Sequence, residues 1–180
     1  MARGHEDAIT LIKTDHRKVE DLFAKFQKAR DQTRKAALAH EICTELMVHA
    51  TIEEEIFYPA CKGKIEDENI LKEAYVEHDE AKVLIAEISE GSPEDEFFDA
   101  KVTVLSELIK HHVKEEEKRS EGLLAEAKAA GLDFEALGAR LAERKKELTE
   151  KLTHAAKLPP PETRSFSGPT LKRGHQVEAA

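Results

Sequence analysis

The feature that most constrains the fold of this chain is a set of potential metal ligands whose spacing pattern occurs twice along the sequence. A histidine and a glutamate four residues apart occur twice, and a single histidine stands at a similar distance before each pair. The six residues are His16, His49, Glu53, His78, His112 and Glu116. Residues four apart share one face of an α-helix, and a dinuclear metal site in a helical bundle needs ligands that project inward from four helices. The spacing therefore predicts four helices around one metal site.

The six residues interrupt four stripes of apolar side chains, which repeat with the three-then-four spacing of a buried helix face. The stripes predict helices at about 6–30, 33–61, 67–90 and 93–131. In the second helix, Ile56 and Ala60 are expected to follow Glu53 on the inward face. Ser92 is the expected N-cap of the fourth helix, and Gly131 is expected to end it.

The predicted helices are joined by short connections, near residues 31–33, 62–66 and 91–93. Short connections make neighbouring helices antiparallel. The ligands of the first three helices also lie at similar distances from these turns, so they are expected to meet at one depth. We therefore predict an all-α fold, an antiparallel up-down-up-down four-helix bundle whose core covers about residues 5–130.

The remainder of the chain is predicted to add one helix and a tail. Asp133 is the expected N-cap of a fifth helix at about 133–157, which carries no ligand pattern and would pack against the bundle. Three consecutive prolines and scattered glycines follow, so residues 158–180 are predicted to form a flexible, extended or disordered tail. Residues 1–157 would then make up the helical domain.

The charge and composition exclude several classes of protein. Acidic residues outnumber basic ones by 37 to 28, for a formal net charge of −9, which would repel a phosphate backbone and argues against a nucleic-acid partner. No apolar run approaches the roughly 20 residues of a membrane span, and no secretory signal is recognisable. Cys43 and Cys61 are too few for a disulfide framework, so we expect a cytoplasmic protein in which both are inert thiols.

The ligand types indicate which metals the site would bind. Six nitrogen and oxygen ligands for two metals suit iron first, with zinc and manganese as alternatives. Buried glutamates are rarely tolerated without a cation, which favours metal binding over ordinary hydrogen-bonded core histidines. Glu53 and Glu116 lie on different helices and could each bridge the metals, with two histidines on each metal. Water, hydroxide or an oxo group would fill further positions, leaving room for O₂, peroxide or nitric oxide.

The other histidines and glutamates are expected to lie outside the site. His111 is turned about 100° from His112 and should face solvent or a neighbouring helix. Four more histidines fall off the stripes, namely His5, His40, His154 and His175. In the acidic runs 53–55 and 115–117, one carboxylate faces inward and the others are expected to be surface charges.

The pattern of His16, His49-x₃-Glu53, His78 and His112-x₃-Glu116 resembles the hemerythrin-like (HHE cation-binding) family over roughly residues 5–130. The second-helix segment from His49 to Pro59 is similar to the family motif, including its Phe-x-Pro ending, whereas Lys118-Arg119-Ser120 departs from it in the fourth helix. The resemblance implies a non-haem centre of two iron ions, bridged by an oxo or hydroxo group, in an up-down-up-down bundle.

One departure bears on function. Oxygen-carrying hemerythrins place two histidines four apart on the third helix, but here Lys82 stands four after His78 and Ala74 four before. The chain resembles the subgroup with one histidine on each of the first and third helices, which makes chemistry on peroxide, O₂ or nitric oxide at least as plausible as O₂ carriage. Tyr75, one turn before His78, is interpreted as a packing residue in preference to a donor or redox side chain.

The leading hypothesis is a cytoplasmic di-iron protein that binds or processes small oxidants, namely O₂, peroxide or nitric oxide. Its enzymatic status is open, and no catalytic residue is assigned. The alternative is an iron-binding sensor or storage module without turnover, in which the tail or the fifth helix reports metal status to a partner. A third interpretation is a structural bundle with satisfied core histidines. The oligomeric state is open.

Overall fold

The structure is a computed structural model that describes residues 6–153, 155 and 157–166. Helices dominate this part of the chain and no β-strand occurs in it, so the prediction of an all-α fold is confirmed. In chain order the elements are α1 (Ala8–Lys28), α2 (Gln32–Ile52), the π-helical turn η1 (Glu53–Phe57), α3 (Tyr58–Cys61), α4 (Glu68–Glu90), α5 (Phe98–Glu116), α6 (Leu123–Ala129) and α7 (Phe134–Thr153). None of these helices is both long and apolar enough to cross a membrane.

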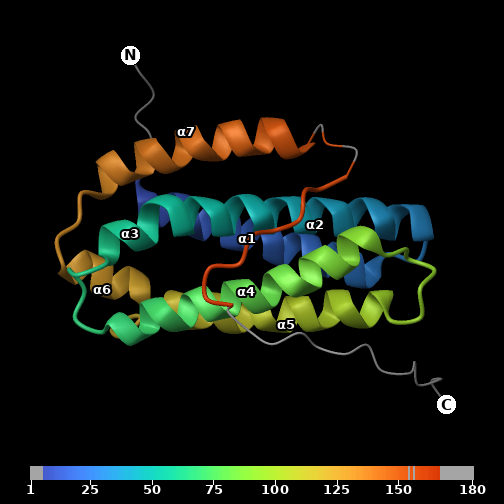
Figure 1. Cartoon of the computed structure of the whole chain (residues 1–180), viewed down its shortest axis with the longest axis horizontal. Coiled ribbons are helices and arrows are strands. Elements are labelled where there is room, and N and C mark those ends of the chain that lie inside the picture. The colour runs from blue at the N-terminus through green and yellow to red at the C-terminus, as the bar shows by residue number, and fades with distance from the viewer. Residues whose placement is uncertain (1–5, 154, 156, 167–180) are drawn as a thin grey trace.

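Four of the five long helices of the described chain, α1, α2, α4 and α5, lie side by side (Figure 1). α1 packs against α2 and α4 against α5, while contacts of α2 with α4 and of α1 with α5 close the group. α7 lies alongside α1 and α2 on their outer surface, and the short α6 contacts α5. Each of these four helices thus contacts two of the others and directs one face toward a shared interior.

The buried apolar side chains form two clusters, one on each side of the predicted ligands along the helices. In α1, for example, His16 lies between Ile12 of one cluster and Val19 of the other. Burial of these apolar side chains stabilises the helices. It also leaves the predicted ligands in a polar layer that apolar side chains seal from both sides.

Aspartate side chains cap several of the helices. A carboxylate oxygen outside the helix accepts a hydrogen bond from a backbone N–H of the first turn, which otherwise has no partner. The pairs are Asp7 with Thr10 at 3.1 Å, Asp31 with Arg34 at 2.8 Å, Asp67 with Asn69 at 2.9 Å and Asp133 with Ala136 at 2.9 Å. The predicted cap at Asp133 is confirmed.

The second predicted helix departs from expectation after Glu53. Its backbone forms the π-helical turn η1, in which the Tyr58 N–H donates to the Glu53 carbonyl five residues earlier. The extra residue shifts the following chain by one position, so Phe57 and Tyr58 are buried. Ile56 and Ala60 are only half-buried. Both still pack against one of the apolar clusters, but the fully buried positions belong to Phe57 and Tyr58, because a strict α-helical period does not anticipate an inserted residue.

The fourth predicted helix begins later than expected. Ser92 is not its N-cap, because the chain from Ser92 to Phe97 forms turns instead. The Ser92 backbone N–H donates to the Asp95 carboxylate at 2.6 Å, and the Asp95 N–H donates to the Ser92 carbonyl at 2.8 Å. These hydrogen bonds offer the backbone a local alternative to a helix, and α5 starts only at Phe98.

The same helix is also interrupted. α5 ends at Glu116, and α6 starts at Leu123 after a polar turn in which the Gly122 N–H donates to the Lys118 carbonyl at 3.1 Å. Gly131 follows α6 with a φ of 69°, the left-handed conformation expected of a residue that ends a helix. Gly131 therefore follows a helix end as predicted, but that helix is α6, and the prediction of one fourth helix continuing to Gly131 was wrong.

The C-terminal segment after α7 crosses the helices without regular secondary structure. Residues 158–166, termed the strap, run from the end of α7 across α2 to α4 (Figure 1). Leu158 is buried in one of the apolar clusters. Four donors of the strap reach the Asp79 carboxylate, namely the N–H groups of Arg164, Ser165 and Phe166 and the Ser165 hydroxyl. The predicted tail residues 167–180 lie outside the described residues.

Candidate metal centre

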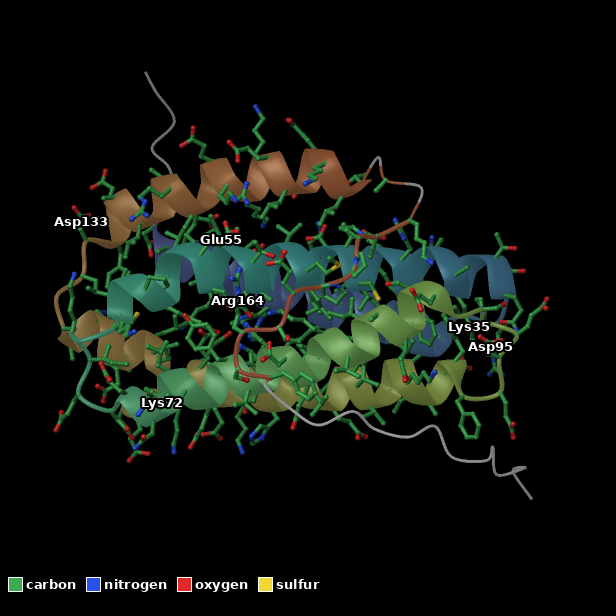
Figure 2. All side chains as sticks on the ribbon, in the orientation of Figure 1. Lys35, Glu55, Lys72, Asp95, Asp133 and Arg164 are labelled. Atoms are coloured by element: carbon green, nitrogen blue, oxygen red, sulfur yellow. The ribbon has the colours of Figure 1, made fainter. Side chains whose placement is uncertain are left out.

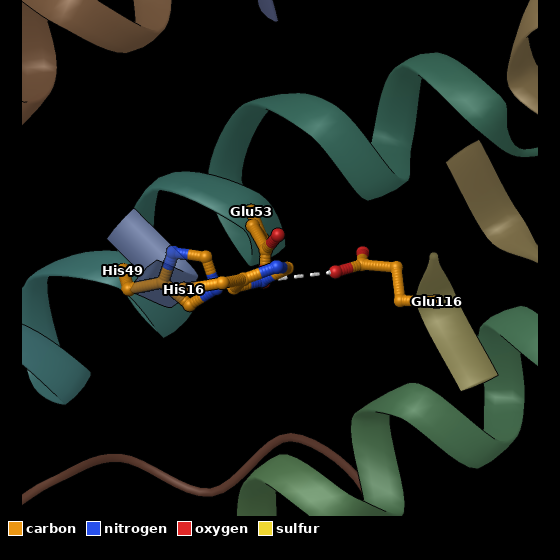
Figure 3. A group of neighbouring side chains, drawn as sticks. All are labelled: His16, His49, Glu53 and Glu116. Atoms are coloured by element: carbon orange, nitrogen blue, oxygen red, sulfur yellow. Dashed lines mark hydrogen bonds and ion pairs between the residues drawn. The ribbon is translucent and has the colours of Figure 1, made fainter. Parts of the chain in front are cut away.

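All six side chains predicted as ligands meet in the polar layer between the two apolar clusters. Ligand atoms of His16, His49, Glu53 and Glu116 lie within 4.8 Å of one another, and the same holds for Glu53, His78 and His112. Each of the six is buried, and Glu53 is fully inaccessible. Figure 3 shows the first group, with the Glu116 carboxylate directed at the His16 ring.

The four histidines form two pairs with facing ring nitrogens. His16 Nε2 lies 3.1 Å from His49 Nε2, and His78 Nε2 lies 3.3 Å from His112 Nε2. Metal–imidazole bonds are about 2.0–2.1 Å long, so two nitrogens at this separation can both reach one ion. Each pair therefore has the spacing of two ligands on one metal.

The two glutamates lie between the histidine pairs. Glu53 Oε2 is 3.3 Å from His49 Nε2 and 3.4 Å from His78 Nε2. Glu116 Oε2 is 3.3 Å from His16 Nε2 and 3.8 Å from His112 Nε2. Each carboxylate thus lies near one histidine of each pair.

A second set of carboxylates faces the opposite nitrogen, Nδ1, of the same rings. Three of them lie within hydrogen-bond distance: Glu117 of His16 at 2.8 Å, Glu54 of His78 at 3.0 Å and Glu77 of His112 at 2.8 Å. The fourth, Asp15, has its Oδ2 3.6 Å from His49 Nδ1. A carboxylate at Nδ1 keeps the proton on that nitrogen and leaves the lone pair of Nε2 directed inward.

These donors fit a pair of cations. When each ring carries its proton on Nδ1 alone, the two Nε2 lone pairs of a pair are free to bind one cation. In the described part of the chain, Glu53 Oε1 and both carboxylate oxygens of Glu116 are buried without a hydrogen bond. Buried carboxylate oxygens are costly unless a cation or a donor meets them. The nitrogen and oxygen set also matches iron, zinc or manganese by ligand type.

The charges of the site are strongly coupled. Burial lowers the pKa of His16, but the neighbouring Glu116 carboxylate at 3.3 Å and the hydrogen bond with Glu117 outweigh this and raise the pKa to about 10. Burial and the neighbouring Glu116 charge raise the pKa of Glu53 to about 7. Burial also opposes the charge of Glu116, yet the contact with His16 at 3.3 Å and the other nearby imidazoles bring its pKa to about 2. Metal binding here must therefore displace protons.

Two predicted surface carboxylates belong to the site instead. Glu54 is buried and bound by the Lys82 ammonium at 2.6 and 2.8 Å, and Glu117 holds His16 while pairing with Arg17 at 2.5 Å. The prediction that they are surface charges was wrong. Glu54 was missed because η1 brings two consecutive glutamates inward, and Glu117 because it reaches His16 from another helix.

Tyr58 is a further residue that the sequence reasoning missed. Its side chain is fully buried, with the hydroxyl 3.2 Å from Glu53 Oε2 and 3.2 Å from His78 Nε2. Burial and the Glu53 charge raise its pKa well above the usual value, so the phenol keeps its proton. Tyr75 packs edge-on against the Tyr58 ring, with centroids 5.1 Å apart, which agrees with its predicted packing role. The signal for Tyr58 in the sequence was its position five residues after Glu53, which is the hydrogen-bond spacing of a π-helical turn.

The remaining histidines and the cysteines lie outside the cluster or outside the described residues. His111 and His40 are exposed, as expected. His5, His154 and His175 lie outside the described residues. Cys43 and Cys61 are free and buried, and burial raises the pKa of each to about 12, which agrees with inert thiols.

A small cavity of about 20 Å³ lies beside all four histidines. Apolar side chains make up much of its wall, namely Val19, Leu46, Ile85, Ile109 and Val113. A volume of this size holds one molecule about as small as water. The arrangement can therefore admit a small ligand to the histidine side of the centre while excluding bulk solvent.

Comparison with known proteins gives the same assignment as the geometry. The family model "Hemerythrin HHE cation binding domain" matches residues 7–124. A DNA nickase from Nostoc sp. strain PCC 7120 is 33% identical over 107 residues, which cover 59% of this chain but only 30% of the nickase. The crystal structure of a hemerythrin HHE cation binding domain-containing protein from Mycobacterium kansasii shares the fold, with a TM-score of 0.67 at 20% identity over 81% of this chain and 89% of that one. Because the family model covers more than half of its residues, this chain belongs to the hemerythrin HHE cation-binding domain family.

Proposed function

We propose that this protein holds two iron ions, with His16 and His49 on one ion, His78 and His112 on the other, and Glu53 and Glu116 bridging them. In this proposal α1, α2, α4 and α5 act as an antiparallel up-down-up-down bundle around the ions. The observation that carries the proposal is the arrangement of paired Nε2 atoms with a carboxylate between the pairs on each side. Two buried free thiols are in keeping with a cytoplasmic location.

We propose that the centre binds or processes O₂, peroxide or nitric oxide. An iron pair would supply electron exchange with such a molecule. The protein would contribute the apolar cavity beside the histidines, which limits the size of the ligand, and a proton held at the Tyr58 hydroxyl, 3.2 Å from Glu53. The carboxylates that face Nδ1 would keep the histidine rings in place when the charge at the metal centre changes.

The iron content of the purified protein tests metal binding directly. We expect two iron ions per chain and near-ultraviolet charge-transfer bands that change when azide or peroxide is added. Bands unchanged by both ligands would contradict an accessible centre. Less than one metal ion of any kind per chain, even after reconstitution, would contradict the proposal as a whole.

Substitution of the bridging carboxylates gives the sharpest test at the residue level. In the double variant Glu53→Gln/Glu116→Gln, both bridges lose their charge, so we expect loss of at least one of the two metal ions. A matched control is Glu80→Gln/Glu115→Gln, which removes two exposed carboxylates from the same region and should keep full loading. Full metal content in the first variant would show that these glutamates do not hold the ions.

A second candidate function is metal sensing without turnover. It is favoured by the strap and α7, which contact carboxylates of the centre through Arg164 and Lys145 and could report whether it is loaded. Peroxide consumption separates the two candidates. Many turnovers per chain would support an enzyme, whereas a single stoichiometric oxidation would support a sensor or a store.

DNA nicking is not part of the proposal. The match to the nickase covers only 30% of that protein, and the formal net charge of −9 opposes binding to a phosphate backbone. We expect no cleavage of supercoiled plasmid by this chain with iron, manganese or magnesium, as measured by gel electrophoresis.

A further inference from the structure

Two carboxylates of the metal centre are paired with cations from beyond residue 124, where the family match ends. One cation belongs to α7 and the other to the strap. Each cation contacts a carboxylate that faces the Nδ1 atom of one histidine, and the two histidines belong to different pairs. The C-terminal segment therefore reaches both halves of the centre, although it supplies none of the six predicted ligands.

Lys145 of α7 reaches the first histidine pair. Its ammonium contacts Asp15 Oδ1, while Asp15 Oδ2 faces His49 Nδ1 at 3.6 Å. Asp15 is buried, and within the described residues neither Oδ2 nor His49 Nδ1 makes a hydrogen bond. Lys145 thus holds one oxygen of a carboxylate whose other oxygen is the acceptor facing His49. A small rotation of that carboxylate decides whether the hydrogen bond forms.

Arg164 of the strap, labelled in Figure 2, approaches the second histidine pair through Glu54. Its Nε lies 3.3 Å from Glu54 Oε2, and Glu54 Oε1 lies 3.0 Å from His78 Nδ1. Lys82 binds both oxygens of Glu54, so Arg164 is a second cation on the same carboxylate. The Arg164 N–H donates to Asp79 at 2.9 Å, which fixes the backbone from which the guanidinium extends.

We propose that α7 and the strap complete the metal centre, with Lys145 as a positioning residue for His49 and Arg164 as a positioning residue for His78. The inference rests on the proposed metal binding. A cation on the far side of a carboxylate fixes its orientation and weakens its pull on the imidazole proton. Without the cation, the carboxylate turns more freely and its negative charge acts more strongly on the ring. The Nδ1 hydrogen bond and the strength of Nε2 as a ligand then both change.

Zinc-loaded protein allows a test that resolves the two histidines, because zinc is diamagnetic and ring N–H groups held by carboxylates can be followed by ¹⁵N-edited NMR. Lys145→Met is expected to shift or broaden the Nδ1–H signal of His49 and leave that of His78 in place. Arg164→Met is expected to do the opposite, and Lys145→Arg and Arg164→Lys to restore the signals. Loss of an outer partner costs about 10–100-fold in metal affinity, and these cations lie one contact further out, so we expect zinc affinity to fall by about tenfold or less.

Two exposed lysines, one in α7 and one just before the strap, provide matched controls. Lys146→Met and Lys157→Met each remove one charge from a loose surface ion pair, with Glu150 at 3.9 Å and Glu90 at 3.6 Å. Both controls should leave the two imidazole signals unchanged. If Lys145→Met and Arg164→Met behave like the controls while the wild type holds two zinc ions, the inference is wrong and the proposed function stands. If the wild type binds neither zinc nor iron, both are wrong.

Discussion

At the scale of single residues, the orientation of each ring distinguishes these histidines from ordinary core histidines. A carboxylate at Nδ1 satisfies one nitrogen of His16, His78 and His112. The other nitrogen faces a second imidazole and a glutamate, and in His78 the Tyr58 hydroxyl as well. In the metal-free site, buried oxygens of Glu53 and Glu116 are left without a hydrogen bond within the described residues, which is unfavourable. Binding of cations should stabilise the fold for the same reason.

The Tyr58 hydroxyl donates a hydrogen bond to Glu53 in this cluster. Its removal tests how much that hydrogen bond stabilises the metal-free site. Tyr58→Phe keeps the ring that stacks on His78, with centroids 5.4 Å apart, but leaves the buried Glu53 Oε2 without its phenolic donor. An unsatisfied buried acceptor costs about 1–3 kcal/mol. We expect the free energy of unfolding of the metal-free protein to fall by about that amount, as measured by urea denaturation.

Tyr75→Phe is the matched control for the Tyr58 substitution. Tyr75 touches the Tyr58 ring, but its own hydroxyl makes no hydrogen bond within the described residues, and it borders an open surface groove. Surface substitutions of this kind usually change stability by less than about 0.5 kcal/mol. Equal losses in the two variants would show that the Tyr58 hydroxyl has no particular role in the cluster.

At the scale of the helices, η1 explains how one segment places a carboxylate on the Nε2 side of the His78 ring and another on its Nδ1 side. A regular α-helix would turn Glu54 about 100° away from Glu53, yet both are buried here. The π-helical turn allows Glu53 to reach the histidine pairs, Glu54 to reach His78 from outside, and Tyr58 to return to Glu53. Such turns are rare overall, and those that do occur often lie at functional sites.

The turn after α5 imposes a second constraint on the centre, because Glu116 and Glu117 occupy its start. Gly122 packs against this turn, and a Cβ there would lie 2.5 Å from the Glu116 carbonyl oxygen and 2.6 Å from that of Glu115. Both are backbone atoms, so the turn must move to accept a larger residue. We expect Gly122→Ala to lower the free energy of unfolding by about 1–3 kcal/mol. We also expect it to weaken metal binding, as measured by competition with a chelator.

Gly131→Ala serves as a control that separates the loss of stability from the loss of metal affinity expected for Gly122→Ala. Gly131 has a φ of 69° and no atom near its missing Cβ, so alanine there costs roughly 1 kcal/mol from backbone strain alone. Gly131 follows α6 and contacts none of the six predicted ligands, so metal affinity should not change. If Gly122→Ala lowers stability but binds metal as tightly as Gly131→Ala does, the turn does not position the glutamates.

At the scale of the whole molecule, the sequence predicted those features that depend on local periodicity. Apolar stripes located the long helices, which confirmed the all-α prediction, and six polar interruptions identified the side chains that the structure brings together. Periodicity succeeds here because a helix face repeats regularly along the chain. The binding of metal by these six residues stays a prediction that the experiments above test.

The features that the sequence did not predict depend on irregular backbone or on distant pairing. The register after Glu53 depends on one inserted residue, which costs little locally but changes every later contact of that segment. Asp15 and Lys145 are separated by 130 residues, and Glu54 and Arg164 by 110. Many exposed lysines and arginines could have taken those places by sequence pattern alone. Only the packing of α7 and the path of the strap select these two.

The strap gives the molecule a pH dependence with a defined sign. Burial opposes the charge of Asp79, but the hydrogen bonds from Ser165 and from the backbone of residues 164–166 outweigh it and bring its pKa to about 2, below the usual 3.8. A carboxyl group with a lowered pKa in the folded state stabilises that state above its unfolded pKa, and the effect is lost as the pH falls through the folded pKa. We therefore expect the strap to be fully docked above about pH 4 and to loosen progressively toward pH 2.

Asp79→Asn reproduces the uncharged form of Asp79 at neutral pH, without acidifying the rest of the molecule. Hydrogen bonds to a charged group contribute about 1.5–3 kcal/mol each, so we expect amide hydrogen exchange at residues 164–166 to accelerate by about tenfold or more. Glu80→Gln, on the exposed face of the same helix, should leave these rates unchanged. Because Asp79 anchors the backbone of Arg164, the released strap should also lose its contact with Glu54. Unchanged exchange in Asp79→Asn would mean that the apolar contacts of Leu158 and the prolines hold the strap, and that its docking does not depend on the Asp79 charge.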